Sequence, residues 1–121
     1  MEIIRGGRIY LAPSNYHLMF ENGNLFSLSV SEPVNHSRPS IDICFETAAE
    51  VYGTRLVGVV LSGANMDGAK GLARVKKEGG LTIVQDPKDS EIQTMPEACL
   101  HLFEPDHIYD AARIISFITN L

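Results

Sequence analysis

The sequence predicts an α/β fold: a mostly parallel, doubly wound sheet with helices on both faces and one antiparallel hairpin. Strand and helix patterns alternate from residue 40 onward, which is typical of a parallel sheet covered by helices. Before them, Asn22-Gly23 separates two alternating apolar runs, and this dipeptide is the strongest short signal for a β-hairpin. The hairpin is therefore an antiparallel addition to the parallel sheet.

Length and charge place the chain among ordinary globular proteins. Its 121 residues suffice for one domain or a large piece of one, and they carry a net charge of −5 at pH 7. An acidic balance argues against nucleic acid as a partner, because phosphate binding needs a basic face. No run of about 18 apolar residues occurs, so we expect no membrane insertion.

The cysteines and the amino terminus indicate the compartment. Residues 1–7 have no long apolar core after their basic residue, which argues against a signal peptide. Cys44 and Cys99 each lie among apolar neighbours and are interpreted as buried free thiols in a reducing compartment. We therefore expect a cytoplasmic protein. Cysteine and histidine are too sparse for a zinc site, and we expect neither metal nor cofactor.

The first third of the chain predicts strands and a loop. Residues 8–12 form a short strand that ends at Pro13, and residues 16–20 and 24–30 form the hairpin. His17 lies in this hairpin, where a polar side chain is expected to face outward. Residues 31–39 are polar and contain two prolines, so they form a loop.

The remaining residues alternate between helix and strand. Ser40 caps a helix that reaches about Tyr52 and is stopped by Gly53. Asp110 caps the last helix, and Pro96 suits the first position of a short helix that reaches about residue 102. Between these helices the pattern predicts strands over residues 55–61, 81–84 and 107–109, and a helix over residues 68–78.

Asp67 is the best candidate for a catalytic side chain. It follows a buried strand at the start of a helix, where a parallel sheet places its sites. A carboxylate there can accept the Nδ1–H of a histidine and stabilise the imidazolium that forms during catalysis. The alternative is capping of the helix that Asp67 precedes, since Asp is a preferred N-cap. The two roles are compatible.

The small residues around Asp67 allow close backbone approach. Gly63, Gly68 and Gly71 resemble a phosphate loop, but they match neither glycine-rich motif, and Asp67 would repel a phosphate. The loop is better suited to donating a backbone N–H, such as that of Ala64, to an oxyanion. Small residues equally suit a tight turn without function.

No activated nucleophile or convincing base can be identified in the sequence. Ser62 follows a strand but lacks the flanking glycines of a nucleophile elbow. His36 lies in a loop that could line a site, whereas His101 and His107 lie near element ends and are expected at surface or second-layer positions. Arg38 could hold a carboxylate through a bidentate contact, although a surface salt bridge is the commoner role.

Four motifs, in order and at fitting spacings, resemble the catalytic domain of bacterial chemotaxis protein-glutamate methylesterases, the CheB family. They cover nearly the whole chain, but only the carboxy-terminal half of that domain. The motifs are RIYLAP at 8–13, HSRPSID at 36–42, GVVLSGANMDGAKG at 58–71, and TIVQD at 82–86 followed by MP at 95–96.

The resemblance implies hydrolysis of glutamate methyl esters on chemoreceptors by a Ser-His-Asp triad, within chemotaxis and phosphorelay signalling. It carries Asp67 over as the triad acid and Ala64 as a donor to the oxyanion. Asn65, Met66, Arg38 and Met95 are expected to belong to the oxyanion loop or to line the substrate. Family members commonly have Met and Gly where this chain has Ala64 and Asn65, which changes the wall and freedom of the loop.

The resemblance also implies what this stretch of sequence lacks. The family's serine and histidine lie upstream of its Ala-Pro strand, as does its receiver domain. We therefore expect the chain alone to be inactive. Its expected partners are methyl-accepting chemotaxis receptors or a similar methylated protein, the upstream half of the domain in cis or in trans, and a second copy of the chain. The alternative is a non-catalytic α/β binding or regulatory module that has lost the chemistry.

Overall fold

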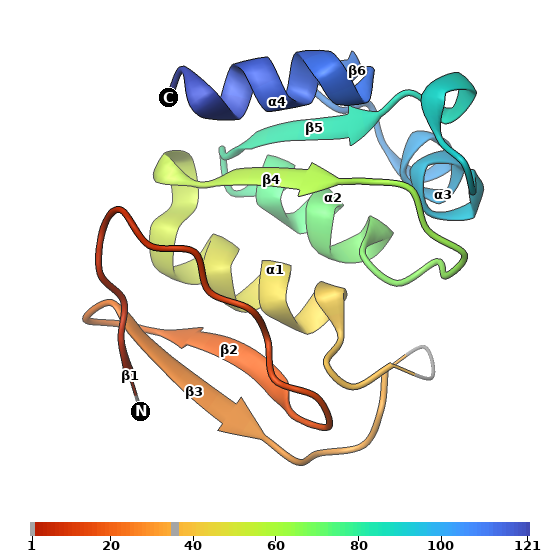
Figure 1. Ribbon diagram of the computed structural model, residues 1–121. Helices are drawn as coiled ribbons and strands as arrows, with labels where there is room; N and C mark the ends of the chain where they lie inside the picture. Colours follow the sequence, from red (N-terminus) through yellow and green to blue (C-terminus); the bar gives the residue numbers. More distant parts are fainter. Residues whose placement is uncertain (1, 35–36) are drawn as a thin grey trace.

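The computed structural model describes residues 2–34 and 37–121, and Figure 1 shows them as layers. One three-stranded sheet is antiparallel, in the order β1-β3-β2, and the other is parallel, in the order β4-β5-β6. Helix α1, Ile41–Tyr52, lies between the antiparallel sheet and helix α2, Ala69–Lys77. The two sheets are separate, so the predicted hairpin does not extend the parallel sheet.

The parallel sheet confirms the predicted alternation of strands and helices. Its strands are β4 Val57–Val60, β5 Leu81–Gln85 and β6 His107–Tyr109, with β5 in the centre. Helix α2 covers one face, and α4, Ala111–Thr119, lies on the opposite face (Figure 1). Helix α3, Thr94–Leu102, packs against α2 and begins two residues before Pro96. The short helices η1, Gly53–Arg55, and η2, Pro87–Asp89, complete this half.

A continuous apolar core joins α2 to the parallel sheet. The central strand supplies residues that are apolar on both faces because helices cover both, as in other parallel sheets. The buried members of this core are Ala49, Val60, Ala69, Leu72, Val75, Val84 and Cys99. The described residues contain no helix long and apolar enough to cross a membrane.

The antiparallel sheet consists of β1 Glu2–Ile3, β2 His17–Glu21 and β3 Leu25–Ser29. The hairpin that Asn22-Gly23 predicts is confirmed, because β2 pairs with β3. Positive φ occurs one residue later than the dipeptide suggests, at Gly23 and Asn24. The strand expected over residues 8–12 is wrong. This segment pairs with no strand of the described chain, and Ile9 and Leu11 are 94% and 89% exposed. A strand needs a partner strand for its backbone groups, and residues 2–34 and 37–121 supply none to this segment.

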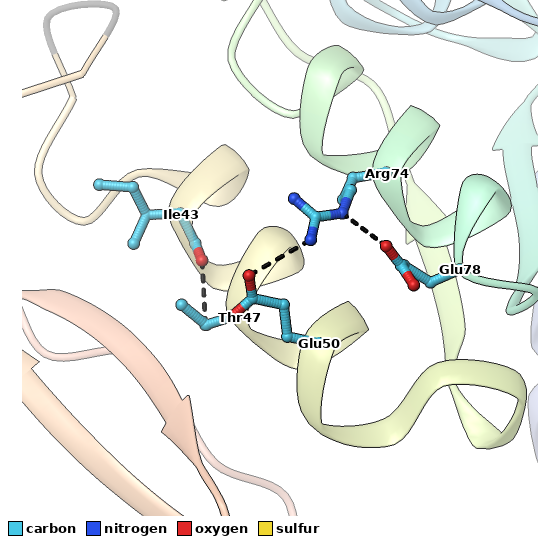
Figure 2. Close-up of polar contacts among 5 residues, drawn as sticks. All are labelled: Ile43, Thr47, Glu50, Arg74 and Glu78. Carbon is cyan, nitrogen blue, oxygen red and sulfur yellow. Dashed lines mark hydrogen bonds and ion pairs between the residues drawn. The ribbon is translucent and has the colours of Figure 1, made fainter.

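Helix α1 begins and ends where the sequence predicts. Ser40 is its N-cap and accepts a hydrogen bond from the amide of Ile43, and Gly53 ends it with a φ of 52°. Thr47 bonds the helix to β2, because its hydroxyl oxygen accepts from the amide of Phe20. The same hydroxyl donates to the carbonyl of Ile43, as Figure 2 shows.

The first halves of α1 and α2 approach closely at Gly71. A Cβ atom at this glycine would lie 2.8 Å from the Cα of Asp42 and 2.8 Å from the Cβ of Phe45. Farther along, Arg74 bridges Glu50 of α1 and Glu78 of its own helix (Figure 2). These ion pairs are largely exposed and add little stability. The contact at Gly71 is what brings the two helix N-termini together.

Candidate functional site

The Asp67 side chain lies at the carboxyl end of β4, as predicted, and is 2% exposed. Its carboxylate accepts from the hydroxyl of Ser40 at 2.8 Å and from the amides of Ile41 and Asp42, all at the start of α1. The positive end of a helix dipole and its free amides favour a negative charge there. The start of α1 thus supplies hydrogen-bond donors to both oxygens of the Asp67 side chain.

The expectation that Asp67 caps α2, the helix that follows it, is wrong, because Asp67 caps α1 instead. The N-cap of α2 is Gly68, whose φ of 109° suits a residue without Cβ. Asp42, from α1, supplies the missing acceptor: its Oδ1 accepts from the amides of Gly68 at 2.9 Å and Gly71 at 2.7 Å. Each helix therefore has its first turn capped by an acid that belongs to the other helix region.

This exchange places two carboxyl groups in one buried position. The pKa of Asp42 is raised, first by its burial, and further by the charge of Asp67 and a hydrogen bond to that side chain. The amides of Gly71 and Gly68 act in the opposite direction because they favour the carboxylate. Asp42 was absent from the predicted site, although its place in the RPSID motif beside Ser40 is the signal that could have found it.

Hydrogen bonds to Ile92 and Gln85 hold the loop that precedes Asp67. Ser62 donates through its hydroxyl to the carbonyl of Ile92 and accepts from the amide of the same residue. The Ser62 amide donates to Oε1 of Gln85, at the end of the central strand. Ser62 therefore anchors the loop.

Met95 lies against the same loop. Its amide donates to the carbonyl of Gly63 at 2.9 Å, and its side chain fills the space where a Cβ of Gly63 would stand, 2.6 Å from the Met95 Cε. The Gly63 amide donates to the carbonyl of Ile92. A larger residue at position 63 would therefore displace the end of the Met95 side chain. Whether Met95 also lines a substrate stays a prediction.

Residues 64–66 form the outer part of the loop. Asn65 accepts the amide of Asp67 at 2.8 Å and donates to the hydroxyl of Ser37 at 2.9 Å, which ties the loop to the segment before α1. Ala64 and Met66 are exposed. Within the described part of the chain, the Ala64 amide makes no hydrogen bond. It meets the requirement for a donor to a bound oxyanion, and that role stays a prediction.

Arg38 follows Ser37, which accepts a hydrogen bond from Asn65 of the loop. The predicted contact of Arg38 with a substrate carboxylate stays a prediction. Its guanidinium donates to the carbonyls of Val30 at 3.0 Å and Ser31 at 3.4 Å. Across residues 2–34 and 37–121, no carboxylate forms a salt bridge with it. Arg38 thus fastens the loop before α1 to the end of β3.

His17 is buried, so its expected outward orientation is wrong. Its Nδ1 accepts from the amide of Ser40 at 3.1 Å, and its Nε2 donates to the carbonyl of Glu32 at 2.9 Å. The loop before α1 covers the start of β2, which the hairpin pattern could not reveal. This geometry uses the neutral imidazole with its proton on Nε2.

The other histidines fall where expected or outside the described residues. His101 is exposed, and His107 is half-buried and stacked on Tyr109 at 4.7 Å between ring centroids. His36 lies outside the described residues. The described residues include no group of three or more His, Cys, Asp or Glu that could hold a metal ion.

Ser40, His17 and Asp67 are neighbours, but they do not form a nucleophilic triad. The Ser40 hydroxyl donates to Asp67, and no part of that serine is exposed to a substrate. Both ring nitrogens of His17 are engaged by backbone groups, so neither receives the proton of Ser40 Oγ. The Ser40 hydroxyl holds the Asp67 carboxylate in place, and His17 holds the amide of Ser40.

Comparison with known proteins identifies the relatives of this arrangement. The sequence profile of the family described as CheB methylesterase matches residues 1–118. A putative protein-glutamate methylesterase/protein-glutamine glutaminase of Leptospira interrogans is 48% identical over 120 residues, which are 99% of this chain and 62% of the relative. The enzyme of that name from Symbiobacterium thermophilum is 34% identical over 97% of this chain and 32% of its own length.

The solved structures agree with the sequence relatives. The crystal structure of the Thermotoga maritima CheB methylesterase catalytic domain matches with a TM-score of 0.86 and 31% identity. The match covers 92% of this chain and 60% of that domain, so the chain spans about three fifths of it. The α/β fold with a parallel sheet and a separate antiparallel sheet is therefore that of the relatives, and the chain belongs to the CheB methylesterase family.

Proposed function

We propose that this chain is the carboxy-terminal part of a protein-glutamate methylesterase domain that demethylates chemotaxis receptors. The observation that carries the proposal is the buried Asp67 carboxylate at the end of β4, held by Ser40 and the first amides of α1. Beside it, the exposed loop presents the Ala64 amide. An oriented acid next to a backbone donor is the arrangement that acyl transfer requires.

In this proposal the serine and the histidine belong to the part of the domain that this chain does not span. The serine oxygen attacks the ester carbonyl carbon, and the histidine takes the serine proton. Asp67 orients that histidine, and loop amides stabilise the oxyanion. The histidine then protonates the departing methoxide to methanol. Water hydrolyses the acyl-enzyme, which releases the glutamate carboxylate and restores the serine.

The 121 residues alone are expected to show no esterase turnover, because covalent catalysis is lost with the nucleophile. Adding the upstream part of the domain, fused or as a separate polypeptide, should restore methanol release from a methylated receptor peptide. Methanol release is the measurement. The matched control is the same mixture with Asp67→Asn in the chain. Turnover by the chain alone that disappears with Asp67→Asn would contradict the proposal.

The parallel sheet provides a physical reason for this dependence. Strand β4 is at the edge of the sheet, with β5 on one side only, and Leu61 at its end is 50% exposed. An edge strand presents unpaired N–H and C=O groups to another strand. We propose that the upstream part of the domain adds a strand at this edge, and that a second copy of the chain occupies the edge when that part is absent.

Sedimentation equilibrium at micromolar concentration tests the role of this edge. The chain alone is expected to self-associate, and the upstream part should replace the second copy to give a one-to-one complex. Val59→Lys in β4 serves as a disrupting variant, because Val59 is half-buried and a lysine on an edge strand opposes pairing. A stable monomer with no exposed apolar patch would show that these residues form a complete unit.

The alternative function is a non-catalytic binding or regulatory module. It is favoured by one observation: Ser40, which bonds to the acid, and Ser62, in the loop before it, are both committed to structural hydrogen bonds. The reconstitution experiment separates the two functions, because a module without chemistry remains inactive when the upstream part is present. Binding to a methylated receptor peptide without turnover would then support the module.

A further inference from the structure

Asp42 places a carboxyl group where helix capping requires only a neutral acceptor. Its Oδ1 alone accepts the two amides of α2, and a neutral oxygen in that place would satisfy them equally well. The structure instead places a second carboxyl group beside Asp67, where burial and the neighbouring charge both oppose ionisation. Capping of α2 alone does not require this second carboxyl group so close to Asp67.

The surroundings of Asp42 contain charges of both signs. Glu46, on the same helix, has its pKa raised by its burial and then by the charge of Asp42. Lys70 of α2 and His101 of α3 line a hollow of about 360 Å³ together with Asp42. Burial raises the pKa of Cys99 on α3, and the charge of Asp42 raises it further. Of these groups, Asp67 is the one that forms a hydrogen bond with Asp42.

We propose that Asp42 is a positioning residue for Asp67, and that its negative charge increases the proton affinity of the base that Asp67 orients. The inference rests on the proposed function of Asp67. Two links connect the residues: Asp42 holds the amide of Gly68, next to Asp67 in the chain, and its own amide donates to the Asp67 carboxylate. A displacement of Asp42 therefore moves the acid.

The expected electrostatic effect has a definite sign. A negative charge near an imidazole favours its protonated form and raises its pKa. The acid limb of the kcat/KM profile reports the ionisation of the free enzyme's base. Removing the charge of Asp42 should therefore lower the pKa of that base and move the acid limb to lower pH. A purely mechanical role for Asp42 would leave the limb unmoved.

The test uses variants in the protein that carries this chain, at its full natural length. Asp42→Asn keeps the Oδ1 acceptor for Gly68 and Gly71 and supplies an amide that can donate to Asp67. Asp42→Ala removes both. Asp110→Asn is the matched control, because Asp110 caps α4 through the amide of Arg113. We expect Asp42→Asn to shift the acid limb with less than about a tenfold loss of plateau kcat, and Asp42→Ala to lose about 10²-fold.

An unshifted acid limb in Asp42→Asn, or an equal shift in Asp110→Asn, would overturn the inference. A separate measurement keeps it testable if Asp67 proves to have no catalytic role. Carboxyl-carbon NMR titration of Asp42 should show a raised pKa in the wild type and a lower pKa in Asp67→Asn, because that substitution removes the neighbouring charge. Full activity of Asp67→Asn would refute the proposed function alone. An unchanged Asp42 titration in Asp67→Asn would refute the coupling of the two acids.

Discussion

Asp67→Asn is expected to lower kcat of the reconstituted methylesterase by about 10⁴-fold, the loss that follows when the acid of a Ser-His-Asp triad becomes an amide. The amide can no longer hold the histidine in the tautomer that accepts the serine proton, nor stabilise the imidazolium. The measurement is single-turnover hydrolysis of a methylated receptor peptide. Activity near that of the wild type would remove Asp67 from the mechanism.

The same residue has a structural role that must be separated from catalysis. Both carboxylate oxygens accept hydrogen bonds at the start of α1, and Asn offers one acceptor in place of two. Each buried donor left without an acceptor costs about 1–3 kcal/mol. Asp67→Asn should therefore lower the free energy of unfolding by about 1–3 kcal/mol, and Asp67→Ala should lower it further because it removes both acceptors.

Comparing the two variants distinguishes catalysis from capping. If Asp67 only capped α1, kcat of the folded fraction would be unchanged in both, and the loss of stability would explain any lost activity. If Asp67 orients a base, the Asn variant is inactive even when it is folded. Urea unfolding shows whether it is folded: a free energy of unfolding of about 1.4 kcal/mol or more keeps over nine-tenths of the protein folded. Ser40→Ala is a useful control, because it removes one donor to Asp67 and leaves the carboxylate in place.

Local patterns were sufficient to predict most elements of this fold. An N-cap serine, helical spacing of apolar residues and a stop glycine predict the helix over residues 40–52, and all three are present in α1. The strand ending before Ser62 was predicted from its apolar run, and β4 lies there. The same reasoning placed Asp67 at the carboxyl edge of the sheet, because the position depends only on where a strand ends and a helix begins.

The errors concern contacts between residues that are distant in the sequence. Asp67 precedes α2 but caps α1, and its partners there are about 25 residues away along the chain, as the bond from the Asp42 amide shows. His17 was assigned outward because period-two alternation describes a hairpin and not the loop that covers it. The segment 8–12 has strand-like residues but no partner strand. Each of these outcomes depends on tertiary packing, which overrides local propensity.

Gly71→Ala is expected to destabilise the protein, although an alanine in a helix is ordinarily better than glycine by about 1 kcal/mol. The new Cβ would lie 2.8 Å from the Cα of Asp42 and 3.0 Å from the carbonyl oxygen of that residue. Both are backbone atoms, so no side-chain rotation relieves the overlap and α1 must move away from α2. Overpacking of this kind costs about 1–3 kcal/mol, occasionally more.

Moving α1 away from α2 has a second consequence. The hydrogen bonds by which Asp42 caps α2 and Asp67 caps α1 both run between these two helices. Moving α1 lengthens the bonds from the amides of Gly68 and Gly71 to Asp42 and those from α1 to Asp67. The free energy of unfolding in urea measures the loss of stability, and amide exchange at Gly68 measures the weakened cap. Gly6→Ala is the matched control, since nothing lies within 4 Å of its added Cβ. If Gly71→Ala is as stable as the control, the helices do not meet at residue 71. The interpretation that each helix is capped by an acid from the other would then be wrong as well.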